Sequence, residues 1–409
     1  MALYAWQEQA LTRAKHTSRL LVQSVTGAGK TRLAIEYIKW ILKEFPDENV
    51  LIIVPKIVIL ETVWMKELYE AGLAPHKTGT YYGKVKEYNK ITITTTASIG
   101  KVNHPIFHNL IIDEIHNIMT PRLMMLFGET WKRVLGLSAT IRREDHRHWE
   151  LLDKFGHECY EYGAVQAILD GVISPLQYHD VPVDITDPST RVRYDEISSR
   201  IRQLAGAAKY SVGSMRSRAQ KALHAACNER NEILFTYLPK LERAVSVIVE
   251  NRDKRVIVFN QRNNVSSKLR WMLLDHGIQA VIVNTSVKEQ ERHRSLESFR
   301  NGTSNVLLAS VSLDEGTNIP SSDVAIILSG TRTERQVVQR AGRVLRKTNK
   351  TKIANVYQLY LTRTIEEEAA TKRAKFFQSL QAASELADKK EKERNLSTFR
   401  KVVNLLDEL

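Results

Sequence analysis

The chain has 409 residues, of which 43% are hydrophobic and 26% are charged, a composition that excludes a disordered or fibrous protein and allows two or three folded domains. Its formal net charge of +14 favours an acidic partner, most commonly nucleic acid. The two cysteines form no CxxC or Cys/His cluster, so the sequence indicates neither a disulfide framework nor a structural zinc site.

No segment of the sequence is typical of a membrane or secreted protein. The longest apolar stretch, residues 50–60, contains a proline and a lysine and is too short to span a bilayer. The amino terminus lacks the basic and then apolar order of a signal peptide. We therefore expect no membrane partner and a location inside the cell, cytoplasmic or nucleoid-associated, or inside the host cell if the protein is viral.

Short apolar runs alternate with helical periodicity in the amino-terminal part of the chain. A strand at 20–23 precedes a loop at 24–31, and a helix at 31–43 follows it. Strands alternating with helices predict a parallel sheet covered on both faces, with ligands at the carboxyl ends of the strands. The later strands of this sheet are predicted at 50–54, 91–95, 110–112 and 133–137.

The loop at 24–31 reads Ser-Val-Thr-Gly-Ala-Gly-Lys-Thr. Such a loop surrounds phosphates with backbone N–H groups, so we expect Lys30 to neutralise the β- and γ-phosphates of ATP and Thr31 to ligate Mg²⁺. Ser24 stands where the general GxxxxGK pattern has its first glycine, a position that needs only a small residue. The predicted nucleotide-binding residues of the loop are Thr26, Gly27, Ala28, Gly29, Lys30 and Thr31.

An apolar run ends in two adjacent carboxylates at 111–116, with the sequence Ile-Ile-Asp-Glu-Ile-His. A buried strand can deliver an acid in this way to a metal-bound phosphate. We expect Asp113 to hold Mg²⁺ through water and Glu114 to act as the base that positions the attacking water. The phosphate loop and this acidic pair, in this order, predict a protein driven by a nucleotide.

The pattern changes between residues 165 and 250. Residues 171–185 contain two prolines and resemble an extended connector. Residues 196–230 carry seven Arg or Lys against two Glu and are predicted to be helical. Three interpretations of this basic segment stay open: a solvated helix face, a surface for a partner protein, or a nucleic-acid contact made through Arg216 and Arg218.

The alternation of strands and helices restarts near residue 254, without a second GxxxxGK loop. A helix at 265–276 is predicted to end at Gly277, and the tail from residue 365 is predicted to be helical. We interpret this part as a related sheet that completes the nucleotide site. Its strands are predicted at 255–259, 280–284, 305–309, 324–328 and 353–360.

Eight motifs in this order resemble those of superfamily 2 helicases and translocases. In the first half, the resemblance places Gln7 at the adenine and makes Ser138-Ala139-Thr140 the motif that links the ATP site to the strand-binding face. It implies that His116 connects the carboxylate strand to the second lobe or to Ser138. The residues that it assigns to the nucleic-acid backbone are Pro55, Lys56, Thr95 and Thr96.

The second half carries three further motifs of the same family. Asn260, in Val-Phe-Asn, matches the fourth motif and is expected at the nucleic acid. Gly316 and Asn318, in Gly-Thr-Asn-Ile-Pro, match the fifth and are expected at the nucleotide. The sixth motif, Gln-Arg-Ala-Gly-Arg-Val-Leu-Arg, places the catalytic candidates Gln339, Arg343 and Arg346 on one helix face, since they recur at spacings of four and three. Guanidinium groups delivered from a second lobe can stabilise the transferring phosphoryl group.

The connector at 171–185 resembles the linker strand of helicases of the xeroderma pigmentosum group B type and of the motor subunits of type I and III restriction enzymes. The resemblance implies an α/β protein with two tandem RecA-like, doubly wound parallel-sheet domains, a helical basic insertion and a C-terminal helix. The implied boundaries are a first RecA-like, ATP-binding domain at 1–165, a linker strand and basic insertion at 166–250, a second RecA-like domain at 251–370 and a helical extension at 371–409.

The implied activity is that of an ATP-dependent DNA helicase or translocase, acting on duplex or branched DNA. Phosphate contacts alone do not separate DNA from RNA, so an RNA helicase of the same fold stays an alternative. An ATP-dependent DNA remodeller or loader that does not separate strands is a second alternative, because motifs do not report the wedge that strand separation requires.

Overall fold

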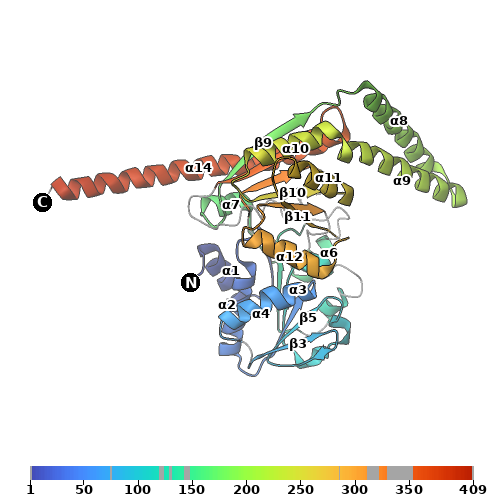
Figure 1. The fold of residues 1–409 in the computed structure, drawn as a ribbon. Helices are drawn as coiled ribbons and strands as arrows, with labels where there is room; N and C mark the ends of the chain where they lie inside the picture. Colours follow the sequence, from blue (N-terminus) through green and yellow to red (C-terminus); the bar gives the residue numbers. More distant parts are fainter. Residues whose placement is uncertain are drawn as a thin grey trace.

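The computed structural model shows two α/β lobes, one above the other, with two long helical features that project from the upper lobe (Figure 1). Among the described residues, none of the helices combines the length and apolarity that a bilayer crossing requires. The structure describes residues 2–73, 76–118, 124–128, 131–141, 148–284, 286–310, 322–328 and 353–407.

The first lobe is built on an eight-stranded sheet with the order β4-β3-β5-β2-β6-β7-β1-β8. Its strands run parallel, apart from the antiparallel pair β3–β4 at one edge. The strands are β1 (Arg19–Ser24), β2 (Val50–Val54), β3 (Thr78–Tyr82), β4 (Val85–Lys86), β5 (Ile91–Thr95), β6 (Asn109–Ile112), β7 (Arg133–Ser138) and β8 (Cys159–Tyr162).

Helices cover both faces of this sheet (Figure 1). The central strands are buried along their whole length, as expected for parallel strands packed on both sides. α2 buries Leu33, Ile38 and Ile41 on the face that meets the sheet. The helical elements are α1 (Ala5–His16), α2 (Lys30–Glu44), α3 (Ile57–Ile59), η1 (Leu60–Trp64), α4 (Met65–Glu70), η2 (Ile99–Lys101), η3 (His104–Ile106), η4 (Ile115–Ile118), η5 (Met125–Gly128) and α6 (His148–Lys154).

The second lobe has a six-stranded parallel sheet with the order β11-β12-β10-β13-β14-β9. Gly277, at a φ of 70°, follows α11 in the turn that leads to β11. The elements are β9 (Leu176–Val183), β10 (Val256–Asn260), β11 (Ala280–Val283), β12 (Val306–Ser310), β13 (Val324–Ile327), β14 (Ala354–Leu361), α7 (Ala164–Leu169), α10 (Leu238–Glu250), α11 (Asn263–Leu274) and α12 (Glu289–Arg300).

The segment that resembles an extended connector supplies the edge strand of the second sheet. β9 pairs in parallel with β14 over eight residues, from Leu176 opposite Ala354 to Val183 opposite Leu361. α14 (Ile365–Asp407) covers the outer edge of β9: the N–H of Leu176 donates to Ser384 Oγ at 2.8 Å. The free edge of the strand is thereby closed by side chains of a helix.

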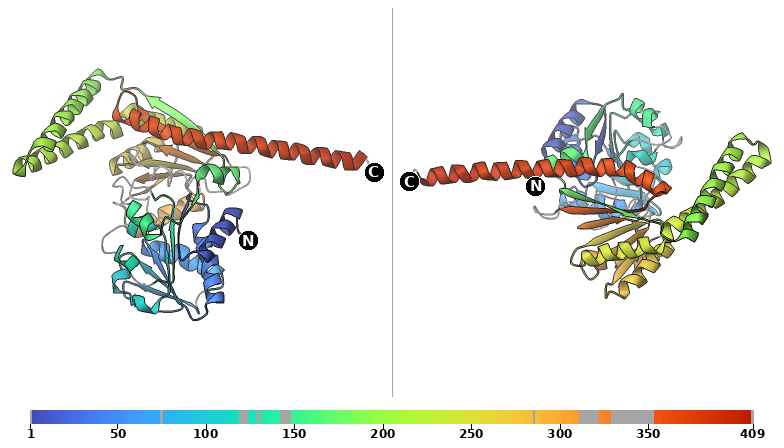
Figure 2. Two further views of the ribbon diagram at one scale, coloured as in Figure 1. Left: turned by 180° about the vertical axis from the view of Figure 1, so that it is seen from behind. Right: turned by 90° about the horizontal axis from the view of Figure 1, so that it is seen from above.

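The basic segment forms two helices, α8 (Pro188–Tyr210) and α9 (Gly213–Thr236), that pack along each other as a hairpin and project away from the second lobe (Figures 1 and 2). The Asp187 carboxylate caps α8 by accepting from the N–H of Thr190 at 2.8 Å. α14 projects in another direction (Figure 2). The predicted helical insertion is thus a hairpin, longer at both ends than 196–230.

The base of the hairpin is fixed to the turn between β14 and α14. The N–H of Ile365 donates to the Tyr194 hydroxyl at 2.9 Å, and Arg191 donates to the carbonyl of Arg363 at 2.9 Å. Lys240, fully buried at the start of α10, forms an ion pair with Glu366 at 2.9 Å. Burial lowers the pKa of Lys240, and the Glu366 carboxylate opposes this shift.

Candidate nucleotide site and nucleic-acid face

The predicted phosphate loop joins the end of β1 to the start of α2. Gly27 and Gly29 have φ values of 90° and 94°, which only glycine adopts without strain, so the loop turns sharply into the helix amino terminus. The ammonium of Lys30 donates to the carbonyl of Ser24 at 2.9 Å and so lies across the loop. Backbone N–H groups at a helix start, beside a lysine, form a site that suits a phosphate.

Asp113 follows β6 and is buried beside this loop. Its Oδ2 accepts from the indole N–H of Trp64 at 2.9 Å, and its Oδ1 accepts from the N–H of Glu114 at 3.0 Å. Burial raises the pKa of the Asp113 carboxyl above its usual range, whereas the Trp64 bond and the nearby Lys30 ammonium act in the opposite direction. Trp64 could not be predicted as part of the site, because its partner lies 49 positions away in the chain.

Glu114 has a backbone conformation that is unusual for a side chain of its type. Its φ of 46° lies in the left-handed region, where non-glycine residues are strained and which is enriched at functional sites. Its carboxylate lies 3.4 Å from Nδ1 of His116. The backbone therefore turns the two neighbouring acids in different directions, Asp113 toward Trp64 and Glu114 toward His116.

His116 contacts Ser138, at the end of β7. Its Nδ1 lies 2.8 Å from Ser138 Oγ, and this hydroxyl donates its single hydrogen to the carbonyl of Thr140 at 2.8 Å. Ser138 must then accept from His116, which places a proton on Nδ1. Of the two partners that the sequence leaves open for His116, the structure shows Ser138.

Gln7 is fully buried at the start of α1 and contacts the phosphate loop. Its Nε2 donates to the carbonyl of Gly29 at 2.9 Å, and its Oε1 accepts from the N–H of Tyr4 at 2.8 Å. The neighbouring Trp6 stacks on Tyr162 with ring centroids 4.8 Å apart. The amide is thus placed at the loop, and its predicted adenine contact stays a prediction.

The residues predicted at the nucleic-acid backbone meet at the carboxyl ends of β2 and β5. Thr96 Oγ1 donates to the carbonyl of Pro55 at 3.2 Å, and Lys56 is exposed beside it. Thr95 is buried and contacts Ser98. In the second lobe, the buried Asn260 bonds to Ser266 Oγ at 2.9 Å, so its amide braces the turn after β10. These contacts leave the predicted nucleic-acid roles untested.

The predicted residues of the fifth and sixth motifs lie outside the described residues. They are Gly316, Asn318, Gln339, Arg343 and Arg346.

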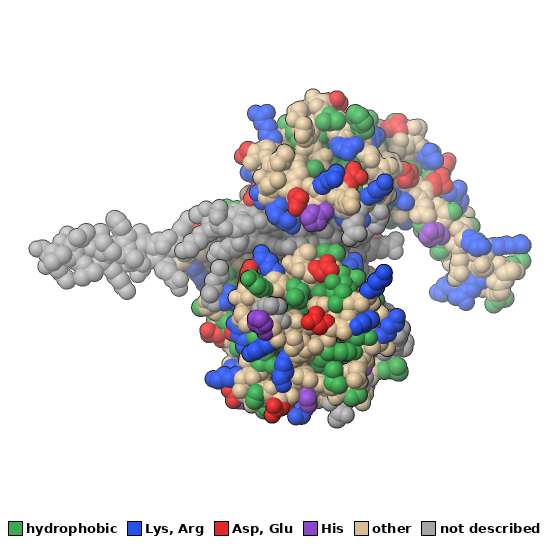
Figure 3. Space-filling model, turned by 60° about the horizontal axis from the view of Figure 1, so that its bottom comes forward, with side chains coloured by type: hydrophobic (Ala, Val, Ile, Leu, Met, Phe, Trp, Pro, Cys, Tyr) green, Lys and Arg blue, Asp and Glu red, His purple; other side chains and the backbone are tan. Residues whose placement is uncertain are grey.

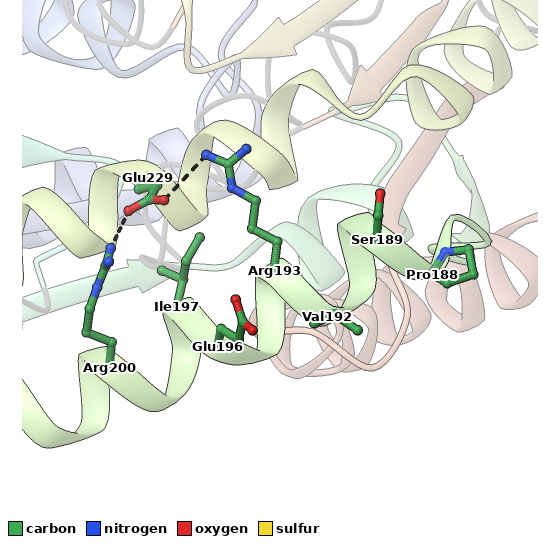
Figure 4. A pocket seen from close by; sticks show the side chains of 8 residues that line it. All are labelled: Pro188, Ser189, Val192, Arg193, Glu196, Ile197, Arg200 and Glu229. Carbon is green, nitrogen blue, oxygen red and sulfur yellow. Dashed lines mark hydrogen bonds and ion pairs between the residues drawn. The ribbon is translucent and has the colours of Figure 1, made fainter.

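A cavity of about 720 Å³ lies away from the phosphate loop, between α8 and α9 near the base of the hairpin (Figure 4). Arg193 and Arg200, about two turns apart on α8, both reach Glu229 of α9, and the Arg193 pair is 3.4 Å long. One carboxylate of α9 thus pairs with two cations of α8 at this level. Mostly exposed ion pairs of this kind contribute little stability each.

Comparisons with known proteins find a different family model for each lobe. Residues 1–143 match the family described as type III restriction enzyme, res subunit, and residues 239–348 match the helicase conserved C-terminal domain. The crystal structure of the Pyrococcus furiosus Hef helicase domain has the same fold, with a TM-score of 0.63 at 16% identity over 90% of this chain and 97% of that one.

The relatives with similar sequences include a DNA translocase and a DNA helicase. The DNA 3'-5' translocase XPB2 of Sulfurisphaera tokodaii is 25% identical over 84% of this chain and 79% of its own length. The DNA 3'-5' helicase XPB of Mycobacterium tuberculosis is 26% identical over 76% of this chain and 53% of its own length, so the match spans about half of that protein.

These matches, on two parallel-sheet lobes with a phosphate loop in the first, define an ATP-hydrolysing, nucleic-acid-dependent enzyme of the helicase class. Within that class, the sequence is similar to the XPB-type DNA translocases and helicases.

Proposed function

We propose that the chain is an ATP-dependent DNA helicase or translocase that couples ATP hydrolysis to movement along DNA or to its remodelling. The observation that carries this proposal is the shared edge of the first sheet, where the phosphate loop, Asp113 and the His116–Ser138 contact follow parallel strands. The similarity to XPB-type DNA translocases and helicases supports DNA as the substrate. With this substrate, the protein would be located where the cellular DNA is.

Mg²⁺ is the ion that these residues suit. The hydroxyl of Thr31 and the carboxylate of Asp113 are oxygen ligands, which Mg²⁺ prefers, and Asp113 is already oriented by two N–H donors. When bound, the ion would neutralise charge on the β- and γ-phosphates. Lys30 would exchange the Ser24 carbonyl for phosphate oxygens, and Glu114 would orient the attacking water.

The resemblance to superfamily 2 assigns the remaining charge stabilisation to Arg343 and Arg346. On this proposal, closure of the lobes delivers the two guanidinium groups to the γ-phosphate, and hydrolysis reopens the cleft. Replacing Arg346 with Ala should then reduce ATP turnover strongly, while ATP binding is largely retained. Unchanged turnover in that variant would contradict the assignment.

The helical hairpin is the structural feature that favours a nucleic-acid contact outside the motor lobes. From residue 197 to residue 228 the sequence holds six Arg or Lys and no Asp or Glu. Lys and Arg side chains gather at the outer end of the hairpin (Figure 3), where Arg216 and Arg218 are exposed. At 1.5 Å per residue, α8 reaches about 35 Å from the lobe, far enough to lie along a duplex. We propose that the hairpin holds DNA by its phosphates.

The decisive experiment compares the stimulation of ATP turnover by duplex DNA, single-stranded DNA and RNA at one salt concentration. We expect stimulation by DNA and a steep loss of binding with salt. Stronger stimulation by RNA would favour the RNA-helicase alternative. DNA-stimulated turnover without strand displacement on forked DNA would favour a translocase or remodeller. Equal turnover with and without nucleic acid would exclude a coupled motor.

A further inference from the structure

The helical run that follows β2 is interrupted by a π turn. It begins with α3, continues as η1, with π-helical hydrogen bonding, and ends with α4. Isolated π turns are rare and occur frequently at functional sites. This run starts directly after Pro55 and Lys56, the segment at the carboxyl edge of the sheet to which a nucleic-acid contact is assigned above.

The run has one buried face and an exposed beginning. Leu60, Trp64 and Leu68 recur every fourth residue and are fully buried in the core of the lobe. At the other end, Ile57 and Val58 expose 43% and 41% of their surface. The buried residues hold the run as a rigid element against α2 and β5, while its first turn faces solvent at the edge of the sheet.

Trp64 lies within the π turn and donates the indole N–H bond to Asp113 Oδ2 at 2.9 Å. A bond to an ionised carboxylate is stronger than a neutral one, and a buried indole N–H requires a partner. Since the other carboxylate oxygen accepts from the N–H of Glu114, both oxygens of Asp113 are oriented by donors. A displacement of the run would move one of these donors and not the other.

We propose that Trp64 is a positioning residue that transmits nucleic-acid contact at residues 56–58 to the orientation of the Asp113 carboxylate. Trp64 lies six positions after Val58, roughly 9 Å along a helix, so a shift of the first turn is carried directly to the indole. The His116–Ser138 contact approaches the site from β7, whereas this connection comes from β2. The inference rests on the proposed function, because it assumes that nucleic acid binds at this edge.

The test replaces Trp64 with Phe, which removes the N–H and keeps a buried aromatic ring. The first measurement is equilibrium DNA binding by fluorescence anisotropy, with and without a non-hydrolysable ATP analogue and Mg²⁺. Coupling between two sites is reciprocal, so loss of the connection should reduce the nucleotide-dependent change in DNA affinity at least fivefold. DNA affinity without nucleotide should change less than twofold.

The second measurement separates kcat from KM. We expect the stimulation of kcat by saturating DNA to fall at least fivefold, and the half-saturating Mg²⁺ concentration to rise. The matched control is Trp271→Phe, since Trp271 is 65% exposed on α11, far along the chain from this contact. The control should retain the coupling of the wild-type protein.

If Trp64→Phe fails to fold, Trp64 can be replaced by the benzothiophene analogue of tryptophan, which keeps the ring size and lacks only the N–H. Wild-type coupling in the folded Phe variant or in the analogue overturns the inference. Wild-type protein that shows no DNA stimulation contradicts the proposed function instead, so the two failures are distinguishable.

Discussion

The two lobes have the same plan but differ in what stands at the carboxyl edge of the sheet. In the first lobe this edge carries the phosphate loop and the buried acid Asp113, with His116 bonded to Ser138. In the second lobe, the uncharged Asn260 ends β10 and the uncharged Asn284 directly follows β11. Both amides bond to nearby turn atoms, Asn260 to the N–H of Arg262 and Asn284 to that of Ser286.

We propose that one architecture serves two tasks in this chain, according to the residues that follow its strands. Burial of a carboxylate is unfavourable unless donors hold it. Two N–H donors hold Asp113 in the first lobe, where we propose that the acid serves the reaction. Polar side chains that accept hydrogen bonds from the N–H groups of their own turns stabilise the edge of the sheet without creating a reactive group. The described residues at the carboxyl edge of the second sheet are therefore suited to structural support and to ligand contact.

The sharpest test of the comparison is Glu114→Gln, with Asn284→Ala as the matched change at the second edge. Removal of a general base typically reduces kcat by a factor of about 10² to 10⁴. We expect such a loss for Glu114→Gln with ATP and DNA binding retained, measured by steady-state turnover and equilibrium binding. Native turnover in Glu114→Gln, or an equal loss in Asn284→Ala, would contradict the division of tasks.

The lobes also differ in their buried ion pairs, and Lys240→Met tests the stronger one. Lys240 is fully buried and its removal leaves the Glu366 carboxylate without its cation, which should reduce the free energy of unfolding by about 3–5 kcal/mol. Urea denaturation measures this loss. The double variant Lys240→Met/Glu366→Leu should recover most of it, and no recovery would mean that the pair acts through packing alone.

In the first lobe, Glu48 accepts from Arg133 at 2.7 Å and from Lys132 at 2.8 Å. Burial acts to raise the pKa of Glu48, but the bonds from Lys132 and Asn109 and the charge of Arg133 outweigh it and leave the pKa lowered. Because Lys132 is largely exposed, we expect Glu48→Gln to reduce stability by only about 1–3 kcal/mol.

This effect has a defined pH dependence. A carboxyl with a lowered pKa contributes stability that is fully present above the unfolded-state pKa, about 4.3, and that is lost as the pH falls through the lower folded-state value. The difference between the wild-type protein and Glu48→Gln should therefore be largest near pH 7 and shrink below about pH 4. A difference that grows on acidification would contradict the sign of the shift.

The smallest expected effect is that of charge reversal at the hairpin. Arg216→Glu/Arg218→Glu should weaken DNA binding about tenfold and reduce the slope of log K against log salt by about 2. Lys389→Glu/Lys390→Glu, an equal charge change at exposed positions of α14, serves as the control. Equal weakening in both variants would mean that net charge, and not the hairpin, governs binding.

The strands with apolar runs could be predicted from the sequence, several of them to within a residue. The runs at 50–54 and 91–95 became β2 and β5 with unchanged bounds. β3 and β8 were missed because Thr-Gly-Thr-Tyr-Tyr and Cys-Tyr-Glu-Tyr lack an apolar run or a clear alternation. The pairing of β9 with β14 could not be foreseen, since a parallel neighbour so distant in sequence leaves no local pattern.

The candidate site, like the fold, could be predicted from the sequence only in part. Motif spacing placed Lys30, Asp113 and Ser138 at strand ends, and the structure brings those ends to one edge. The hydrogen bonds at the site could not be predicted from the sequence. Trp64 donates to Asp113 from another element, and Gln7 donates to the Gly29 carbonyl. Such contacts depend on tertiary packing, which no local pattern encodes.

The outer position of β9 has a consequence for how the chain is made. Its partner β14 begins at residue 354, so at 5–20 residues per second a ribosome needs roughly 10–35 seconds after producing β9 before β14 exists. The serine and glutamine of α14 that cover its outer side emerge later still. Throughout that interval the nascent second lobe presents β9 as an unpaired strand. This interval is therefore the period of synthesis in which the chain is most exposed to misassembly.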